Sequence, residues 1–320
     1  MMPRARTAAA LVLVVAAALI WAYTVRFSAM CRGACPGPDV IGADAYWLRD
    51  VRWGVVVVVA GLLVVLGAGD RRRGVPVVLG SVAWIGVDVG LDRASAVPSV
   101  VVLALVAAVP PVVAVLLIGR RPPVLRRWPT TAAATVCMTT AVAVAALHGP
   151  GDTDPGPAVV RTATVALLLA AGFAGVAAVA PARVRRLPVV AVLAPSAVVL
   201  IVVIDHLVAL LAGAFLAVGA VTVLSRPWRG GRAAIAPLLW VLIGYPVLSF
   251  VMTLATMDAG RPVTALAGSP AVSPADSDML YTVTAVTAGL ALAAVDGLFR
   301  WARAELRHRP RTPVRPTAVV

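Results

Sequence analysis

Ionisable side chains inside apolar segments are the residues of this chain best placed to do chemistry. Asp88 occurs in Trp-Ile-Gly-Val-Asp-Val-Gly, close to the end of such a segment. A carboxylate there is costly in a lipid bilayer and is a functional candidate by default. Three roles are open to it: binding a proton or cation, pairing with Arg161 at the start of a later apolar segment, or reaching the lipid headgroups.

A second ionisable pair, Asp205-His206, lies between two apolar segments. Asp205 is suited to cap the N-terminus of the helix that follows, because its side chain can accept hydrogen bonds from backbone N–H groups that lipid cannot satisfy. The alternative is a protonation site shared by Asp205 and His206. Asp88, Arg161, Asp205 and His206 are therefore candidate coupling residues for ion-driven transport.

Cysteine chemistry is confined to one short motif. Cys31 and Cys35 occur in Cys-Arg-Gly-Ala-Cys-Pro, and the topology derived below places them outside the cytoplasm. In an oxidising compartment a disulfide that closes this turn is expected. A redox-active pair is the alternative, although redox motifs more often have two residues between the cysteines. Cys137 lies inside an apolar segment and is interpreted as an ordinary small apolar side chain.

Catalytic and metal-binding motifs are not found. The chain has three histidines and a single glutamate, Glu305. The pairs Asp152/Asp154 and Asp276/Asp278 could chelate a cation but lack the fixed glycine and bidentate glutamate of a calcium loop. No nucleophile, hydrolase or phosphate-binding motif occurs. We therefore predict no catalytic residue, metal or cofactor, and consider an outward-facing enzyme on a lipid-linked substrate the least favoured function.

Composition places these residues in a membrane protein. Of 320 residues, 61% are hydrophobic and 13% are charged, and mean hydropathy is +0.96; soluble domains carry about 25% charged residues. Segments long enough to span the hydrocarbon core recur along the chain. We predict an all-α bundle with crossings at 7–23, 52–68, 75–91, 97–118, 131–147, 159–180, 188–204, 207–225, 233–257 and 280–301.

Arginine distribution predicts the orientation. All 28 basic residues are arginine, and 21 of them fall on alternate joints between the crossings. The positive-inside rule then places both termini in the cytoplasm, with long outer loops at 26–51 and 258–279 and a basic, disordered tail at 302–320. Splitting 188–225 into two crossings is required, because a single crossing would invert every later loop. Anionic lipid is the expected partner of the arginine-rich side, and the dispersed arginines argue against nucleic-acid binding.

The absence of lysine, asparagine and glutamine resembles the bias of a GC-rich bacterial genome, so a bacterial plasma membrane is expected. Pro110-Pro111 and Gly244-Tyr245-Pro246 are predicted to interrupt crossings four and nine, which correspond if the chain is a 5+5 inverted repeat. This layout is similar to that of drug/metabolite transporters, but the characteristic segments of that family are not recognisable. A small-solute permease or exporter using crossings four and nine is the favoured function. The alternative is a non-catalytic scaffold or accessory subunit that packs through its small residues.

Overall fold

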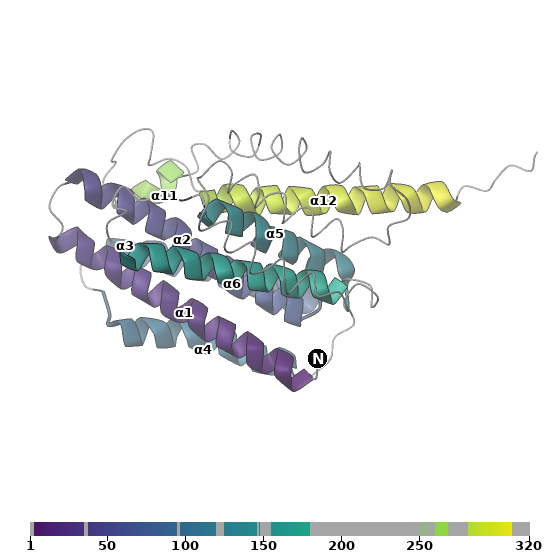
Figure 1. Cartoon of the computed structure of the whole chain (residues 1–320), viewed down its shortest axis with the longest axis horizontal. Helices are drawn as coiled ribbons and strands as arrows, with labels where there is room; N and C mark the ends of the chain where they lie inside the picture. The colour runs from purple at the N-terminus through teal and green to yellow at the C-terminus, as the bar shows by residue number, and fades with distance from the viewer. Residues whose placement is uncertain are drawn as a thin grey trace, which may run out of the picture.

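The structure is a computed structural model that describes residues 3–34, 38–94, 97–119, 125–145, 147, 155–179, 251, 254, 260–267 and 281–308. The elements in these ranges are helices, with no strand among them: α1 (Pro3–Ala34), α2 (Pro38–Leu66), α3 (Arg71–Arg93), α4 (Val100–Gly119), α5 (Arg127–Ala145), α6 (Pro155–Val179), α11 (Gly260–Ala267) and α12 (Tyr281–His308). Figure 1 shows them as a bundle of roughly aligned rods. The predicted all-α class is thus confirmed for the described part of the chain.

Five described helices are long and apolar enough to cross a membrane: Ala5–Ala29, Arg71–Arg93, Val100–Gly119, Arg127–Ala145 and Ala158–Val179. They fall on five of the predicted crossings, which supports a membrane protein. The predicted crossings at 188–204 and 207–225, and all of 233–257 except residues 251 and 254, lie outside the described residues. The total of ten crossings therefore stays a prediction.

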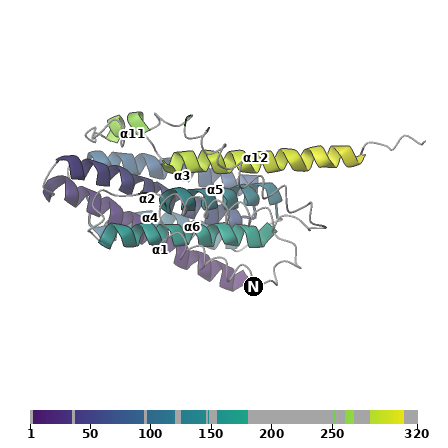
Figure 2. The same ribbon diagram turned by 45° about the horizontal axis from the view of Figure 1, so that its top comes forward.

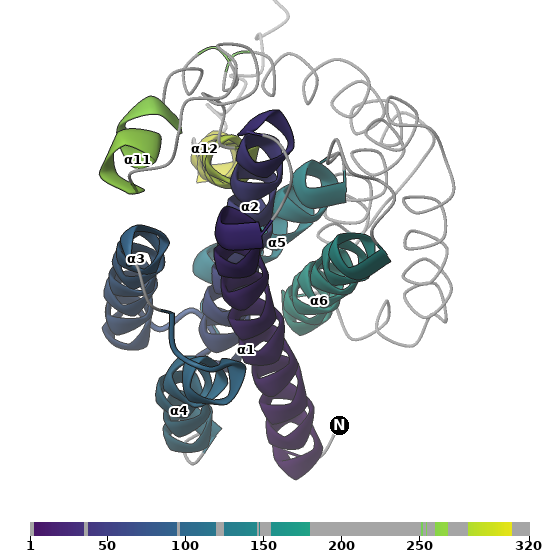
Figure 3. The same ribbon diagram turned by 90° about the vertical axis from the view of Figure 1, so that its left-hand side faces the viewer.

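Helix α2 is central to the arrangement. It contacts α1, α3, α4, α5, α6 and α12, whereas α5 packs mainly on α6 and α12, and α1 packs mainly on α4 and α2. In the end-on view of Figure 3, α3 and α4 lie on one side of α1 and α2, and α5 and α6 lie on the other. The short helix α11 packs against α3 near the end of the bundle (Figure 2).

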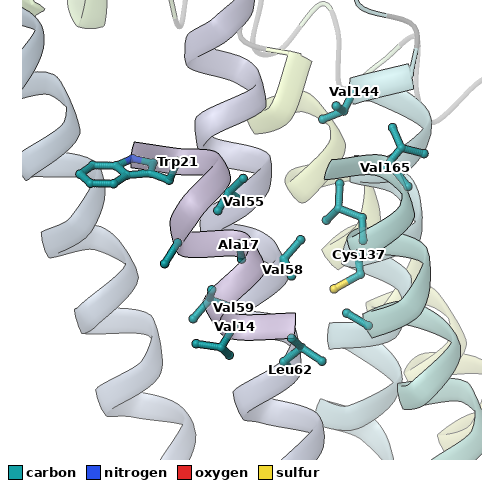
Figure 4. Packing of buried hydrophobic residues seen from close by; sticks show 14 of the residues in the cluster. Val14, Ala17, Trp21, Val55, Val58, Val59, Leu62, Cys137, Val144 and Val165 are labelled. Atoms are coloured by element: carbon teal, nitrogen blue, oxygen red, sulfur yellow. The ribbon is translucent and has the colours of Figure 1, made fainter. Parts of the chain in front are cut away.

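The core between these helices is built from small and β-branched side chains. Figure 4 shows residues of α1 and α2 packed together, with residues of α5 and α6 to their right; those labelled are Val14, Ala17, Trp21, Val55, Val58, Val59, Leu62, Cys137, Val144 and Val165. Close approach depends on glycine. A Cβ on Gly61 would lie 2.3 Å from Cys137 Sγ, so α2 and α5 can approach this closely only while position 61 has no side chain.

The direction of α12 is defined by its contacts with α5. Thr139 Oγ1 donates to the carbonyl oxygen of Ala285 (2.8 Å), and Trp128 Nε1 donates to that of Ala293 (3.2 Å). Residue numbers fall along α5 as they rise along α12, so the two helices are antiparallel. This is the relative direction expected for the fifth and tenth crossings of a chain whose termini share one side of the membrane.

Helices extend into three segments that were expected to be loop or tail. The expected outer loop at 26–51 is largely helical, because α1 continues to Ala34 and α2 begins at Pro38. Helix α11 occupies part of the expected loop at 258–279, and α12 continues through His308 into the expected disordered tail. Hydropathy reports where side chains prefer lipid, whereas a helix ends where its backbone hydrogen bonding ends. Proline at the first position of α2 is compatible with that helix start.

Candidate functional site

Four charged side chains are buried together between the middle of α2 and the last part of α3. Arg49 and Arg52 are three residues apart on α2, and Asp88 and Asp92 are four apart on α3, so each pair lies on one helix face. The short turn between the two helices makes them antiparallel, which brings the middle of α2 beside the end of α3. Exposed fractions are 0% for Arg52 and Asp88, 1% for Arg49 and 7% for Asp92. We call these four residues the ionic cluster.

Arg52 is the centre of the ionic cluster. Its Nε lies 2.8 Å from Asp88 Oδ1, an ion-pair contact whose angle is not that of a hydrogen bond. Its Nη2 donates to Asp92 Oδ1 at 2.9 Å and to Oδ2 at 2.8 Å. Arg49 donates to Asp92 Oδ2 from Nε (3.1 Å) and from Nη2 (3.0 Å). The Arg52 guanidinium thus bridges both carboxylates, and the Arg49 guanidinium binds only that of Asp92.

Neutral donors and acceptors complete this network. Trp21 Nε1, from α1, donates to Asp88 Oδ1 at 2.9 Å, and Trp53 Nε1, from α2, donates to Asp88 Oδ2 at 3.1 Å. The remaining Arg52 nitrogen, Nη1, donates to Ser28 Oγ at 3.0 Å. The Trp84 ring packs edge-on against Trp21, with centroids 5.6 Å apart. Helices α1, α2 and α3 are therefore joined by hydrogen bonds to one buried carboxylate and one buried guanidinium.

Charge balance makes this burial tolerable. Two guanidiniums and two carboxylates sum to zero, and each charge has an opposite partner within hydrogen-bonding distance. An unpaired ion in a low-dielectric interior costs several kcal/mol, and removing one partner of a buried pair typically destabilises by about 3–5 kcal/mol. The cluster consequently favours one relative placement of the three helices over any that separates its charges.

Asp50 links the same end of the bundle to α12. Its Oδ1 accepts from the backbone N–H of Thr282 (2.8 Å), and its Oδ2 from that of Tyr281 (3.3 Å). Thr282 Oγ1 donates to the backbone carbonyl oxygen of Asp50 at 2.9 Å. The first N–H groups of a helix have no partner within it, so a carboxylate from α2 caps α12 and opposes its positive end. Asp50 therefore has a structural role in the described bundle.

The burial and the ion-pair partner of Asp88 differ from those expected from the sequence. It is fully buried, so the expectation that it reaches the headgroups is wrong. It pairs with Arg52, not Arg161; Arg161 Nη1 instead donates to the carbonyl oxygen of Leu147, joining the end of α5 to the start of α6. Sequence order suggested Arg161 only because both residues were assigned to the same membrane face.

The predicted interruption at Pro110-Pro111 is also wrong, because α4 is continuous from Val100 to Gly119. A membrane helix tolerates a proline when local adjustments and neighbouring groups satisfy the freed carbonyls. Pro111 is buried on the face that includes Leu103, Ala107 and Val115, and Pro110 is exposed. Gly244, Tyr245, Pro246, Asp205, His206, Cys35 and the side chain of Cys31 lie outside the described residues, so their assignments remain predictions.

Sequence reasoning missed most of this site. Arg49, Arg52, Asp92, Trp21 and Trp53 were not singled out as candidate site residues. The sequence signal was a pair of arginines in Arg-Asp-Val-Arg at 49–52 and a pair of aspartates in Asp-Val-Gly-Leu-Asp at 88–92. In a helix, residues three or four apart lie on the same face, so each pair presents two like charges to a neighbouring helix. This signal could be recognised only once residues 38–51 were known to be helical.

This arrangement can hold helices together, because each of the four carboxylate oxygens of Asp88 and Asp92 contacts a guanidinium or an indole N–H. Among the described residues, no group of three or more His, Cys, Asp or Glu side chains could hold a metal ion. Comparison with protein-family models, curated proteins and solved structures finds no match to this chain.

Proposed function

We propose that this chain is a multi-pass membrane protein that acts as a non-catalytic scaffold or accessory subunit of a membrane complex, and that α3 is the helix it presents to its partner. Three features support a scaffold. The buried charges are paired with one another, the buried face of α4 packs on α1 through apolar side chains, and α3 presents an apolar outer face that few side chains cover.

The glycines of α3 carry the proposal. A Cβ placed on Gly74, Gly80, Gly86 or Gly90 would meet no atom of the described residues within 4 Å. In α2, α6 and α12 the opposite holds: a Cβ on Gly61, Gly172, Gly175 or Gly289 would come within 2.8 Å of a neighbouring helix. Where a neighbour is described, this protein uses glycine for close helix packing, and α3 is the exception.

Glycine on an exposed helix face lowers the stability of the helix, and no close contact with a described neighbouring helix offsets this loss. Each glycine lowers helix stability by about 1 kcal/mol relative to alanine, and it covers little backbone against lipid. Gly86 and Gly90 are four residues apart, with Ala83 on the same exposed face. Small residues at this spacing let two membrane helices approach closely, which is the packing they commonly support. A transmembrane helix of another protein is therefore the proposed partner.

The membrane assignment is part of the same proposal. It places the chain in a bacterial plasma membrane with ten crossings, both termini in the cytoplasm, and anionic lipid at the arginine-rich side. The antiparallel direction of α12 relative to α5 supports an even-numbered final crossing. A Cys31–Cys35 disulfide on the outer side and a 5+5 repeat are compatible with this placement.

A small-solute permease is the second candidate, and the ionic cluster favours it. Ionisable groups buried within membrane helices often mark a solute or proton pathway. In this alternative the cluster holds the outer end of the bundle closed between transport cycles, and the solute passes near α4 and the predicted crossing nine. Uptake by liposomes containing the purified chain distinguishes the two functions, because a scaffold alone gives none above protein-free liposomes.

The scaffold proposal is tested by adding bulk to the α3 face. Gly86→Leu/Gly90→Leu is expected to shift the protein, extracted in mild detergent from its native membrane, from a large complex to the size of the free chain on a native gel. Val109→Leu/Val113→Leu is the matched control, since these α4 residues have the same spacing and are 55% and 47% exposed. Retention of the large complex by the α3 variant, or equal loss in both variants, would contradict the proposal.

A further inference from the structure

Four exposed arginines gather at the end of the bundle opposite the ionic cluster. Arg71 and Arg72 are the first residues of α3, Arg127 is the first residue of α5, and Arg126 precedes it. All four are exposed. We call them the arginine patch. They come from two parts of the chain more than fifty residues apart, so the fold, and not local sequence, makes them neighbours.

The turn between α2 and α3 brings the two arginine pairs together. The backbone N–H of Arg126 donates to the carbonyl oxygen of Ala68 at 2.8 Å. Gly69 has a φ of +71°, and a Cβ there would lie 2.8 Å from Arg126 O and 3.0 Å from Pro129 Cβ. The turn therefore seats directly on the start of α5, and only glycine allows the approach.

Local electrostatics make this surface positive. Asp70, the nearest carboxylate in the sequence, accepts from the backbone N–H of Arg72 at 3.2 Å and lies 3.9 Å from Arg73 Nε, so it is engaged in capping α3. Helices α3 and α5 both begin at the arginine patch, and the N-terminus of a helix carries a partial positive charge. Four exposed arginines and the starts of two helices thus lie at the same end of the bundle.

An apolar rim lies directly beside the arginines. Trp128 is 52% exposed and Leu125 is 37% exposed. The indole N–H of Trp128 donates to the carbonyl oxygen of Ala293 on α12 at 3.2 Å, which orients the ring. Tryptophan is enriched at the level of lipid headgroups, where its ring contacts acyl chains and its N–H finds a polar partner. The apolar spans of α3 and α5 begin at this same level.

We infer that the arginine patch is a binding site for the phosphate headgroup of an anionic phospholipid, with Trp128 and Leu125 against its acyl chains. Guanidinium is planar and binds phosphate oxygens through paired N–H groups, which suits a phosphodiester. Juxtamembrane arginines are attracted to anionic lipid in the cytoplasmic leaflet. The inference rests on the membrane placement in the proposed function but not on the scaffold role.

Quenching of Trp128 fluorescence by brominated lipids tests the site. The full chain is reconstituted in phosphatidylcholine vesicles that contain a fixed fraction of either brominated phosphatidylglycerol or brominated phosphatidylcholine. The Trp128 signal is the difference between the chain and its Trp128→Phe variant in the same vesicles. The intact patch is expected to favour phosphatidylglycerol by about fivefold or more, which corresponds to about 1 kcal/mol, the attraction of a single arginine.

Two variants separate a defined site from general positive charge. Arg71→Gln/Arg72→Gln/Arg126→Gln/Arg127→Gln should reduce the preference to about one. Arg303→Gln/Arg307→Gln/Arg309→Gln/Arg311→Gln removes the same charge from the C-terminal part of the chain and should leave the preference unchanged. Equal losses in the two variants, or an unchanged preference in the first, would overturn the inference.

Gly69→Ala supplies an independent test, because it retains every arginine while forcing the turn away from α5. The preference should fall in the variant that still reconstitutes with normal helix content, and an unchanged preference would show that the two arginine pairs do not act together. The proposed membrane placement fails in a different way. It would be refuted if neither brominated lipid quenched any tryptophan of the reconstituted chain.

Discussion

Arg52 is the charge whose removal should most disturb the fold. Arg52→Met leaves Asp88 with two indole donors and no cation, and leaves Asp92 with Arg49 alone. The ionic cluster then has two buried carboxylates and one guanidinium. Breaking a buried pair from one side costs about 3–5 kcal/mol, so we expect the free energy of unfolding to fall by about that amount.

Asp88→Asn should stabilise the Arg52→Met variant, although the same substitution should destabilise the wild-type chain. In the Arg52→Met background, Asp88→Asn makes the cluster neutral again, with Arg49 and Asp92 still paired. The asparagine oxygen can accept from only one side, so either Trp21 or Trp53 loses its acceptor, at about 1–3 kcal/mol. The double variant should therefore be more stable than Arg52→Met alone by about 2 kcal/mol, whereas Asp88→Asn in the wild-type chain should destabilise.

The assay is unfolding of the purified chain in mixed micelles, driven by a denaturing detergent and followed by far-UV circular dichroism, for the four members of this cycle. Arg161→Met serves as the control, because Arg161 donates to a backbone carbonyl outside the cluster. If Asp88→Asn changes stability in the same direction in both backgrounds, charge pairing does not hold α2 and α3 together and the reasoning is refuted.

Two further predictions concern contacts between other helices. Asp50→Ala should expose the first N–H groups of α12 and lower stability by about 1–2 kcal/mol, the usual effect of losing a cap; hydrogen exchange should accelerate at Tyr281 and Thr282, and unchanged protection there would contradict the assignment. Gly61→Ala should destabilise in unfolding assays, because the new methyl group would lie 2.3 Å from Cys137 Sγ, and Cys137→Ala should restore part of the loss. The matched substitution Gly80→Ala, which meets open space, should instead stabilise by up to about 1 kcal/mol, and destabilisation of similar size at both positions would count against the packing explanation.

Hydropathy was sufficient to locate the long described helices, but not the short helix α11. The predicted crossings at 75–91 and 97–118 begin and end within four residues of the ends of α3 and α4. A segment of some 20 apolar residues can satisfy its backbone in lipid only as a helix, so its position follows from local sequence. Helix ends were less predictable. Residues 38–51 belong to α2, and within them Arg49 pairs with Asp92 of α3 and Asp50 accepts from the backbone of α12, contacts that are a property of the packed bundle.

Local sequence therefore determined the class of this protein, the approximate placement of its helices and the asymmetry of its arginines, because each of these depends on the preference of a short segment for lipid or water. Tertiary structure decided the partner of Asp88, the use of Asp50 as a cap for α12, and the meeting of Arg71 and Arg72 with Arg126 and Arg127. It also separated the glycines that pack against a helix from those of α3 that face open space. These features depend on distances between segments far apart in the chain, and no periodicity within a single segment encodes such a distance.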